Sequence, residues 1–300
     1  MPKAENYHGQ SVTLTNNLRS ILATKPCINQ INDTMLRSIF FLLLAIHGLI
    51  HLMGFAKAFN FAQVSQLTLP ISKPAGVAWG LTCLLFCTTA LLFLMKKGAW
   101  WALAAAAILL SQILIFTSWQ DAKFGTIANL IVLLSMAPAI GNWQFKRMTN
   151  AELTSFLAAP TTSPTNFSLE KIATLPPVVQ RWLERSNIVG KPTIQRVHLF
   201  QKGEMRTAPD GKWMPVTAEQ WFSTNPPGFI WLADVSMMPM VHLTGRDKYV
   251  DGHGHMLIKA LSLVPVANSS GEKIDQGTML RYLAELVWFP SAATNDYLTW

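Results

Sequence analysis

The sequence predicts a multi-domain protein: a four-helix transmembrane bundle, then an α+β domain in which a helix covers a twisted antiparallel sheet. Three observations carry this prediction. Four long apolar runs lie between residues 35 and 143. Apolar residues then alternate with polar ones from residue 193 onward, which is the spacing of half-buried strands. A helical pattern follows at residues 277–289, which we expect to cover the apolar face of the sheet.

The four apolar runs occupy residues 36–55, 76–95, 99–119 and 124–141. A helix that crosses a bilayer needs about 20 mostly apolar residues, and each run is close to that length. The first run is too long and too far from residue 1 to be a cleaved secretory signal. We therefore expect a multi-pass integral membrane protein.

The remaining segments complete the predicted domain organisation. Residues 1–34 form a polar tail, expected to be loose or partly helical, and residues 35–143 form the transmembrane domain. Residues 144–167 hold a short helix, begun by a capping pattern at Thr149-Asn-Ala-Glu152, and a Pro/Thr/Ser-rich linker. Residues 168–300 form the α+β domain. The last six residues resemble the start of a further strand, so this domain is expected to be incomplete.

Charge sets the expected orientation and excludes one class of partner. Residues 1–150 carry 11 Lys/Arg against three acidic residues, whereas residues 151–300 carry 13 of each kind. The excess flanks the apolar runs, so we do not expect nucleic-acid binding. Eight basic residues fall on the side of the two termini and three on the other side. Lys and Arg are enriched on cytoplasmic loops, which predicts the inner (plasma) membrane with both termini in the cytoplasm.

Six strands are expected in the second domain. They are residues 193–201, 204–207, 214–222, 229–238, 248–251 and 255–261. Turn sequences such as Pro209-Asp-Gly211 and Asp251-Gly-His-Gly254 separate some of them. The helix at residues 277–289 is expected to direct Leu280, Leu283, Ala284 and Val287 toward the sheet.

Two pairs of side chains within the apolar runs have metal-ligand chemistry. His47 and His51 lie one turn apart on one face of the first helix, and Cys83 and Cys87 do so on the second. Two imidazoles and two thiolates together suit a tetrahedral zinc or copper site. The alternative is that both histidines are buried and hydrogen-bond to a neighbouring helix. The identity of any cofactor does not follow from the sequence.

No strong catalytic motif is present. The chain has no Gly-x-Ser-x-Gly, no Gly-rich phosphate loop and no His-Glu-x-x-His. Asp251-Gly-His-Gly-His255 contains metal-ligating residue types, but a glycine-rich hairpin accounts for it better. The sequence therefore favours a protein that is not an enzyme.

The soluble half resembles an uncharacterised bacterial membrane-protein family that contains a domain of unknown function. The stretches that carry the resemblance include Leu175-Pro-Pro-Val-Val-Gln-Arg-Trp-Leu183, Thr217-Ala-Glu-Gln-Trp-Phe222, Pro226-Pro-Gly-Phe-Ile-Trp231, Gly245-Arg-Asp-Lys-Tyr-Val-Asp-Gly252 and Arg281-Tyr-Leu-Ala-Glu285. The run from His47 to Phe55 resembles the four-helix module fused to some members. The resemblance implies further strands after Trp300 and implies no activity.

Three functions remain open. The first is a membrane-anchored module that binds a lipid or another apolar small molecule, with a sheet lined by Trp213, Trp221, Phe229, Trp231, Met237, Met238 and Met240. The second is a metal- or haem-dependent redox protein that uses His47 and His51. The third is a structural or partner-binding membrane protein, whose protein partner the sequence does not identify. The candidate ligand-binding residues are Trp221, Trp231, Arg246, Asp247, Arg281, Tyr282 and Glu285, although a set of salt bridges that joins helix to sheet explains the charged ones equally well.

Overall fold

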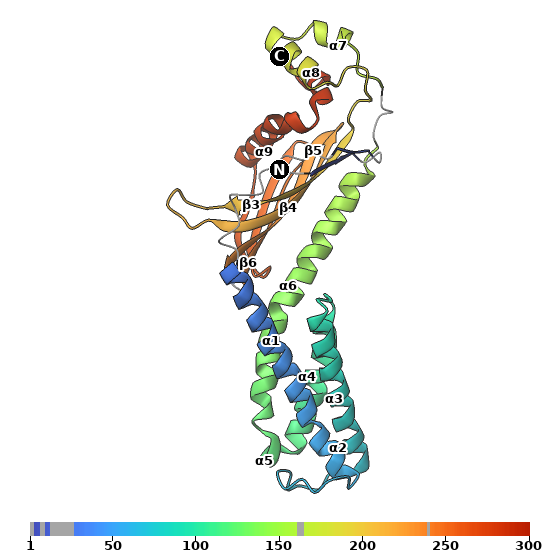
Figure 1. Ribbon diagram of the computed structural model, residues 1–300, viewed down its shortest axis with the longest axis vertical. Coiled ribbons are helices and arrows are strands. Elements are labelled where there is room, and N and C mark those ends of the chain that lie inside the picture. Colours follow the sequence, from blue (N-terminus) through green and yellow to red (C-terminus); the bar gives the residue numbers. More distant parts are fainter. Residues whose placement is uncertain (1–2, 7–9, 13–26, 161–164, 239–240) are drawn as a thin grey trace. The chain divides into compact units, whose positions relative to one another are not determined.

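The protein is described by a computed structural model that covers residues 3–6, 10–12, 27–160, 165–238 and 241–300 (Figure 1). The chain divides into two compact units. One is Leu22–Phe145, and the other combines Met1–Ile21 with Lys146–Trp300. Each unit is described by itself.

The helical unit contains four helices that are long and apolar enough to cross a membrane. In chain order its helices are α1 (Cys27–Ile50), α2 (Leu52–Ala58), α3 (Lys73–Leu94), α4 (Trp100–Thr117), the short α5 (Trp119–Ala122) and the first part of α6 (Gly125–Ala158). The first candidate span covers Thr34–Ala58 and therefore includes both α1 and α2. The four predicted spans are thus confirmed as helices.

Small residues let the helices of this unit approach closely. A Cβ atom added to Gly54 would lie 2.2 Å from the Trp79 ring, and one added to Gly48 would lie 2.8 Å from Phe86 Cβ. The core between the helices includes Leu44, Phe86 and Val132, whose side chains are fully buried. Packing of this kind is typical of helix pairs in membranes.

Helix α6 corrects the expected end of the fourth span. It continues through Gly141 and through the supposed capping box to Ala158. Thr149 is buried and its hydroxyl donates to the Lys146 carbonyl of the same helix, so it starts no new helix. Glycine alone does not end a helix when good helix-forming residues follow it.

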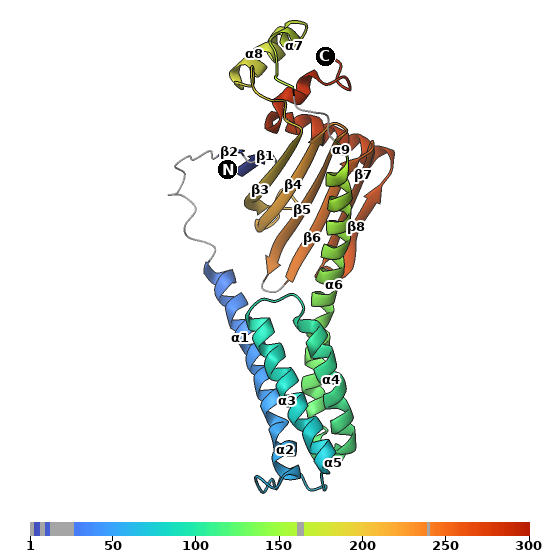
Figure 2. The same ribbon diagram turned by 90° about the vertical axis from the view of Figure 1, so that its right-hand side faces the viewer.

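The second unit is built on an antiparallel sheet (Figure 2). Six strands follow each other as a meander: β3 (Arg196–Met205), β4 (Met214–Thr224), β5 (Pro227–Met238), β6 (Val241–Val250), β7 (His253–Ala260) and β8 (Val264–Ser270). Two short strands from the N-terminal segment, β1 (Lys3–Asn6) and β2 (Gln10–Val12), extend the sheet beside β3. The antiparallel sheet is confirmed, whereas strands β1 and β2 replace part of the expected loose tail.

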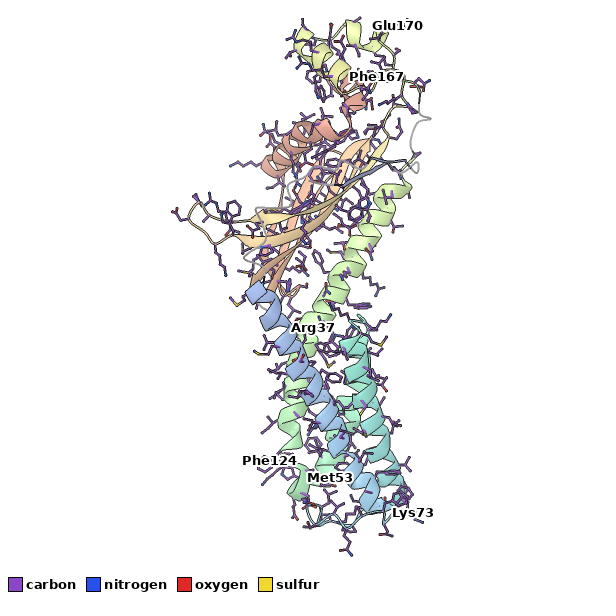
Figure 3. The ribbon with its side chains drawn as sticks, viewed as in Figure 1. Arg37, Met53, Lys73, Phe124, Phe167 and Glu170 are labelled. Carbon is purple, nitrogen blue, oxygen red and sulfur yellow. The ribbon has the colours of Figure 1, made fainter. Side chains whose placement is uncertain are left out.

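Helices cover both faces of this sheet (Figure 1). Helix α9 (Glu272–Ala284) lies on one face, and the part of α6 from Lys146 onward lies on the other. Two short helices, α7 (Glu170–Ala173) and α8 (Pro177–Arg185), form a separate small core around Phe167 and Leu183. Phe167 and Glu170 mark this region in Figure 3.

The sheet face that α9 covers is a solid aromatic core. Phe222, Phe229, Tyr282 and Phe289 are almost fully buried there. The helix itself is turned differently from the prediction, because Leu280, Ala284 and Val287 are exposed and Leu283 is only half-buried. Thr278 and Tyr282 of α9 are buried in their place, as is Leu286 in the 3₁₀ turn (Glu285–Trp288) that follows the helix.

Three further expectations about the second unit need correction. Residues 204–205 are the end of β3 and residues 206–207 lie in the turn that follows, so no separate strand forms there. The unpredicted edge strand β8 contains Pro265, a residue that edge strands tolerate. Residues 295–300 form no strand. Their side chains instead bond to the core, with Asn295 Nδ2 donating to the Thr224 carbonyl and Trp300 Nε1 donating to the Ala293 carbonyl.

Candidate functional site

The candidate ligand-binding residues fall on both faces of the sheet. Trp231 and Asp247 are cross-strand neighbours on the α9 face. Trp221 and Arg246 lie on the α6 face, where Trp221 packs with Phe156 and Arg246 pairs with Glu152. The seven residues therefore do not form one site.

On the α9 face, Arg281 joins the helix to the sheet. Its Nη1 lies 2.6 Å from Asp247 Oδ2, and its Nε lies 3.0 Å from Glu285 Oε1. The guanidinium also lies over two rings, with its centre 4.8 Å from that of Phe229 and 5.0 Å from that of Trp231. Cation–π contacts and a charge-assisted hydrogen bond act together on this one side chain.

The same network continues across the sheet through neutral side chains. Gln220 Nε2 donates to Glu285 Oε2 at 2.6 Å, and Gln201 Nε2 donates to Gln220 Oε1 at 3.1 Å. Trp231 Nε1 then donates to Gln201 Oε1 at 2.8 Å. Four of the predicted residues, Trp231, Asp247, Arg281 and Glu285, thus meet in one hydrogen-bonded set.

Burial controls the electrostatics of this set. Desolvation raises the pKa of Asp247 above its usual value, and the Arg281 guanidinium opposes that rise. Tyr282 lies beside the set with its hydroxyl buried and donating to the Ser223 carbonyl at 3.1 Å. The arrangement fixes α9 on the sheet, as expected of structural salt bridges. A ligand-binding role for these residues stays a prediction.

On the α6 face, one carboxylate serves two cations. Glu152 Oε2 lies 3.0 Å from Arg246 Nε, and Glu152 Oε1 lies 3.0 Å from Lys248 Nζ. Arg246 is almost fully buried and its Nη1 donates to the His255 carbonyl at 2.7 Å. Burial and the nearby Arg246 charge lower the pKa of His255 below its usual value.

A cavity of about 290 Å³ opens beside this triad. Its lining combines apolar side chains with charged and hydroxyl side chains. It is lined by Glu152, Ser155, Phe156, Ala159, Ser223, Pro226, Pro227, Ile230, Lys248, Val250 and Asp251. The Ser223 hydroxyl is buried and has no hydrogen-bond partner in the described part of the chain. We name this space the α6–sheet cavity.

Sequence reasoning missed most of this second site. The sequence pattern places Glu152 in a capping box, and it indicates no role for Lys248 or Ser223. The available signal was the alternation of Arg246 and Lys248, which places two basic side chains on one face of a strand. Such a pair requires an acidic partner when it is covered, and α6 supplies Glu152.

The helical unit contains a third group of polar side chains. His47 and His51 are buried, as predicted. His47 Nε2 lies 2.9 Å from Asn129 Oδ1, and His51 Nε2 lies 3.0 Å from Ser111 Oγ. Both histidines therefore bond to neighbouring helices.

The proposed four-ligand metal set does not assemble. Among the residues that the structure describes, no three His, Cys, Asp or Glu side chains gather where they could hold a metal ion. Cys83 and Cys87 face each other, with their sulfur atoms 4.0 Å apart. Metal binding by His47 and His51 alone stays a prediction.

Comparison with known proteins gives one family. Residues 165–300 match a family of unknown function (DUF6544). This agrees with the resemblance of the α+β domain to an uncharacterised domain. The match begins after α6, so it includes strands β3–β8 and helices α7, α8 and α9, but neither the N-terminal strands β1 and β2 nor the four apolar helices. No curated protein and no solved structure matches the chain.

Proposed function

We propose that this chain is a membrane-anchored binding protein whose sheet unit takes up a small amphipathic molecule in the α6–sheet cavity. The apolar helices α1–α4 and the first part of α6 would hold it in the inner (plasma) membrane. The charge asymmetry of the sequence favours cytoplasmic termini. The cavity itself is the observation that carries the proposal.

The cavity has the composition of a site for a molecule with two chemically different ends. Phe156, Ile230 and Val250 offer an apolar wall. Its volume of about 290 Å³ lies at the lower end of the range of ordinary ligand pockets, about 300–1,000 Å³. An acyl chain or another short apolar group suits such a wall, since its transfer from water is favourable.

The polar part of the lining favours a head group that accepts hydrogen bonds. Lys248 and Arg246 share the single carboxylate of Glu152, which leaves one positive charge uncompensated within this triad. Lys248 is partly exposed and lines the cavity, whereas Arg246 is buried and does not line it. The unpartnered Ser223 hydroxyl gains a partner if a ligand oxygen approaches it, which removes a desolvation cost. A carboxylate or ester oxygen has the required chemistry.

A filled cavity tests the proposal. Ser155 is an exposed α6 residue that lines the cavity, so Ser155→Trp places an indole there with little effect on the core. Thr154→Trp is the matched control, because Thr154 is the exposed neighbour on the same helix and does not line the cavity. The assay is saturable binding of dansyl-labelled undecanoic acid to the full chain in lipid nanodiscs, with decanoate as competitor.

We expect saturable binding to the wild type and to Thr154→Trp, and at least about ten-fold weaker binding to Ser155→Trp, a loss of about 1.4 kcal/mol. Lys248→Met should also weaken binding of decanoate more than that of decanol, since only the carboxylate uses the charge. Equal binding by the two tryptophan variants, or no saturable binding to the wild type, would overturn the proposal.

A further inference from the structure

The helical unit holds a second cavity, of about 360 Å³, that the function proposed above does not use. It is lined by His47, Ile50, His51, Met53, Gln66, Leu67, Trp79, Ile115, Asp121, Ala122, Phe124, Gly125 and Ala128. Met53 and Phe124 mark the end of the helical unit at which it lies (Figure 3). We name it the histidine cavity.

The hydrogen bonds around the cavity fix which atoms donate. Asn129 Nδ2 donates to Ser111 Oγ and to Gln112 Oε1, each at 3.0 Å, so Asn129 Oδ1 is an acceptor. His47 Nε2, 2.9 Å from that oxygen, must therefore carry a proton. His51 Nδ1 faces the His47 carbonyl at 2.8 Å and must also carry a proton, which leaves His51 Nε2 to accept from the Ser111 hydroxyl.

This assignment leaves one polar atom without a partner. In a neutral imidazole with a proton on Nε2, the other nitrogen, Nδ1, is a hydrogen-bond acceptor. No described residue bonds to His47 Nδ1, although His47 is only 5 % exposed and lines the cavity. Every other ring nitrogen of the pair is satisfied within the network. His47 Nδ1 therefore lacks a hydrogen-bond donor among the described residues.

The other residues that line the cavity indicate which kind of molecule can supply this donor. Ile50, Trp79, Ile115 and Phe124 are apolar, and neither Lys nor Arg lines the cavity. The one acidic group, Asp121, is already engaged: its carboxylate accepts from the Thr68 amide at 2.6 Å, the Thr68 hydroxyl at 2.8 Å and the Leu69 amide at 3.1 Å. An anion would find no Lys or Arg as a counter-ion here, and the Asp121 oxygens that would attract a cation already accept hydrogen bonds from the loop. A neutral ligand would lose little on entry.

From these observations we infer that the histidine cavity is a binding site for a neutral, mostly apolar molecule that carries one hydroxyl donor, which His47 Nδ1 accepts. The loop between α2 and α3 closes one side of the site through Gln66 and Leu67. Asp121 holds that loop through Thr68 and Leu69, and Lys57 Nζ donates to the Leu67 carbonyl. The inference is independent of the α6–sheet cavity.

Two probes with the same ring system distinguish a hydrogen bond to His47 Nδ1 from partitioning of an apolar molecule into the lipid. 2-Naphthol carries a hydroxyl donor, whereas 2-methoxynaphthalene has the same ring system and no donor. Binding of each to the full chain in nanodiscs is measured against protein-free nanodiscs of the same lipid. We expect saturable binding of 2-naphthol that is at least about five-fold tighter than that of 2-methoxynaphthalene, as one hydrogen bond of about 1 kcal/mol provides.

Two substitutions locate the site. His47→Phe should abolish the difference between the probes, provided that circular dichroism and gel filtration show a folded protein. Ala128→Trp fills the cavity without changing the histidine network and should abolish saturable binding of both probes. Ile127→Trp is its matched control, since Ile127 is the exposed neighbour on α6 and does not line the cavity.

Equal affinity of the wild type for the two probes would refute the role of His47 Nδ1. Binding that survives Ala128→Trp unchanged would refute the site. An absence of saturable 2-naphthol binding to the wild type would refute the inference as a whole. None of these results depends on whether the α6–sheet cavity binds decanoate.

Discussion

Replacement of Arg281 should loosen α9 from the sheet, and by an amount that depends on pH. Arg281→Met keeps the length of the side chain and removes its charge, which leaves Asp247 without its nearest counter-ion, 2.6 Å away. Loss of one partner from a buried ion pair costs about 3–5 kcal/mol. Arg281 is 28 % exposed and Asp247 15 %, so we expect about 2–3 kcal/mol here, with the two ring contacts included.

The sign of the pH dependence follows from Asp247. Its pKa is raised in the folded protein, so the folded state holds the proton more tightly than the unfolded state. Its contribution to stability is complete below the ordinary carboxyl pKa and is lost as the pH rises through the folded value. Without Arg281 the pKa rises further. The destabilisation by Arg281→Met should therefore be largest at neutral pH and shrink as the pH falls toward 5.

Hydrogen–deuterium exchange of the α9 amides measures this locally. At pH 7 the variant should exchange about 30- to 140-fold faster than the wild type, which corresponds to about 2–3 kcal/mol. The ratio of the two rates, taken at one pH, cancels the intrinsic pH dependence of exchange. The double variant Arg281→Met/Asp247→Asn, which removes both charges, should recover part of the loss. A ratio below about two at pH 7, or one that does not fall at pH 5, would refute the reasoning.

Three other predictions follow from the structure and the sequence. Reporter fusions after Lys97 and after Arg147 should both score as cytoplasmic, and a periplasmic score for the second would reverse the proposed orientation. Gly54→Ala should lower the thermal stability of the helical unit, because the added Cβ would lie 2.2 Å from the Trp79 ring. Gly98→Ala is the control and should change little, because no atom lies within 4 Å of its added Cβ. Equal melting temperatures of the two variants would contradict the close packing of Gly54 against Trp79. Hydrogen bonds from Thr68 and Leu69 lower the pKa of Asp121 in the folded protein, so the stability that this carboxylate contributes is present above the ordinary carboxyl pKa and is lost as the pH falls through the lower folded value. Asp121→Asn should therefore speed amide exchange in residues 59–72 at pH 7. Unchanged exchange would show that the carboxylate does not hold the loop.

The sequence predicts the fold class because the period and length of apolar runs are strong signals. Four runs near 20 residues long became four apolar helices, and alternation from residue 193 became a sheet. Element ends were less predictable. The apolar run of the fourth span stops near Gly141, but its helix continues to Ala158 because polar helix formers follow. The end of an apolar run marks where the apolar surface of a helix ends, and the helical backbone can continue beyond that point.

The candidate site was harder to predict, for a physical reason that α9 illustrates. The pattern of Leu280, Leu283, Ala284 and Val287 suggested an apolar inward face. The structure instead buries Tyr282, whose hydroxyl donates to the Ser223 carbonyl, and directs Arg281 onto two aromatic rings. Such amphipathic side chains bury their bodies while their polar ends find partners from distant strands. Those partners, 34 or more residues away in the chain, are set by strand register.

Mass spectrometry of the small molecules that co-purify with the full chain in mild detergent is the most informative single measurement. The proposed function predicts that an amphipathic acyl-containing molecule is enriched over bulk lipid with the wild type and with Thr154→Trp, and that this enrichment is lost with Ser155→Trp. The same molecules in the same amounts with all three proteins would contradict binding in the α6–sheet cavity.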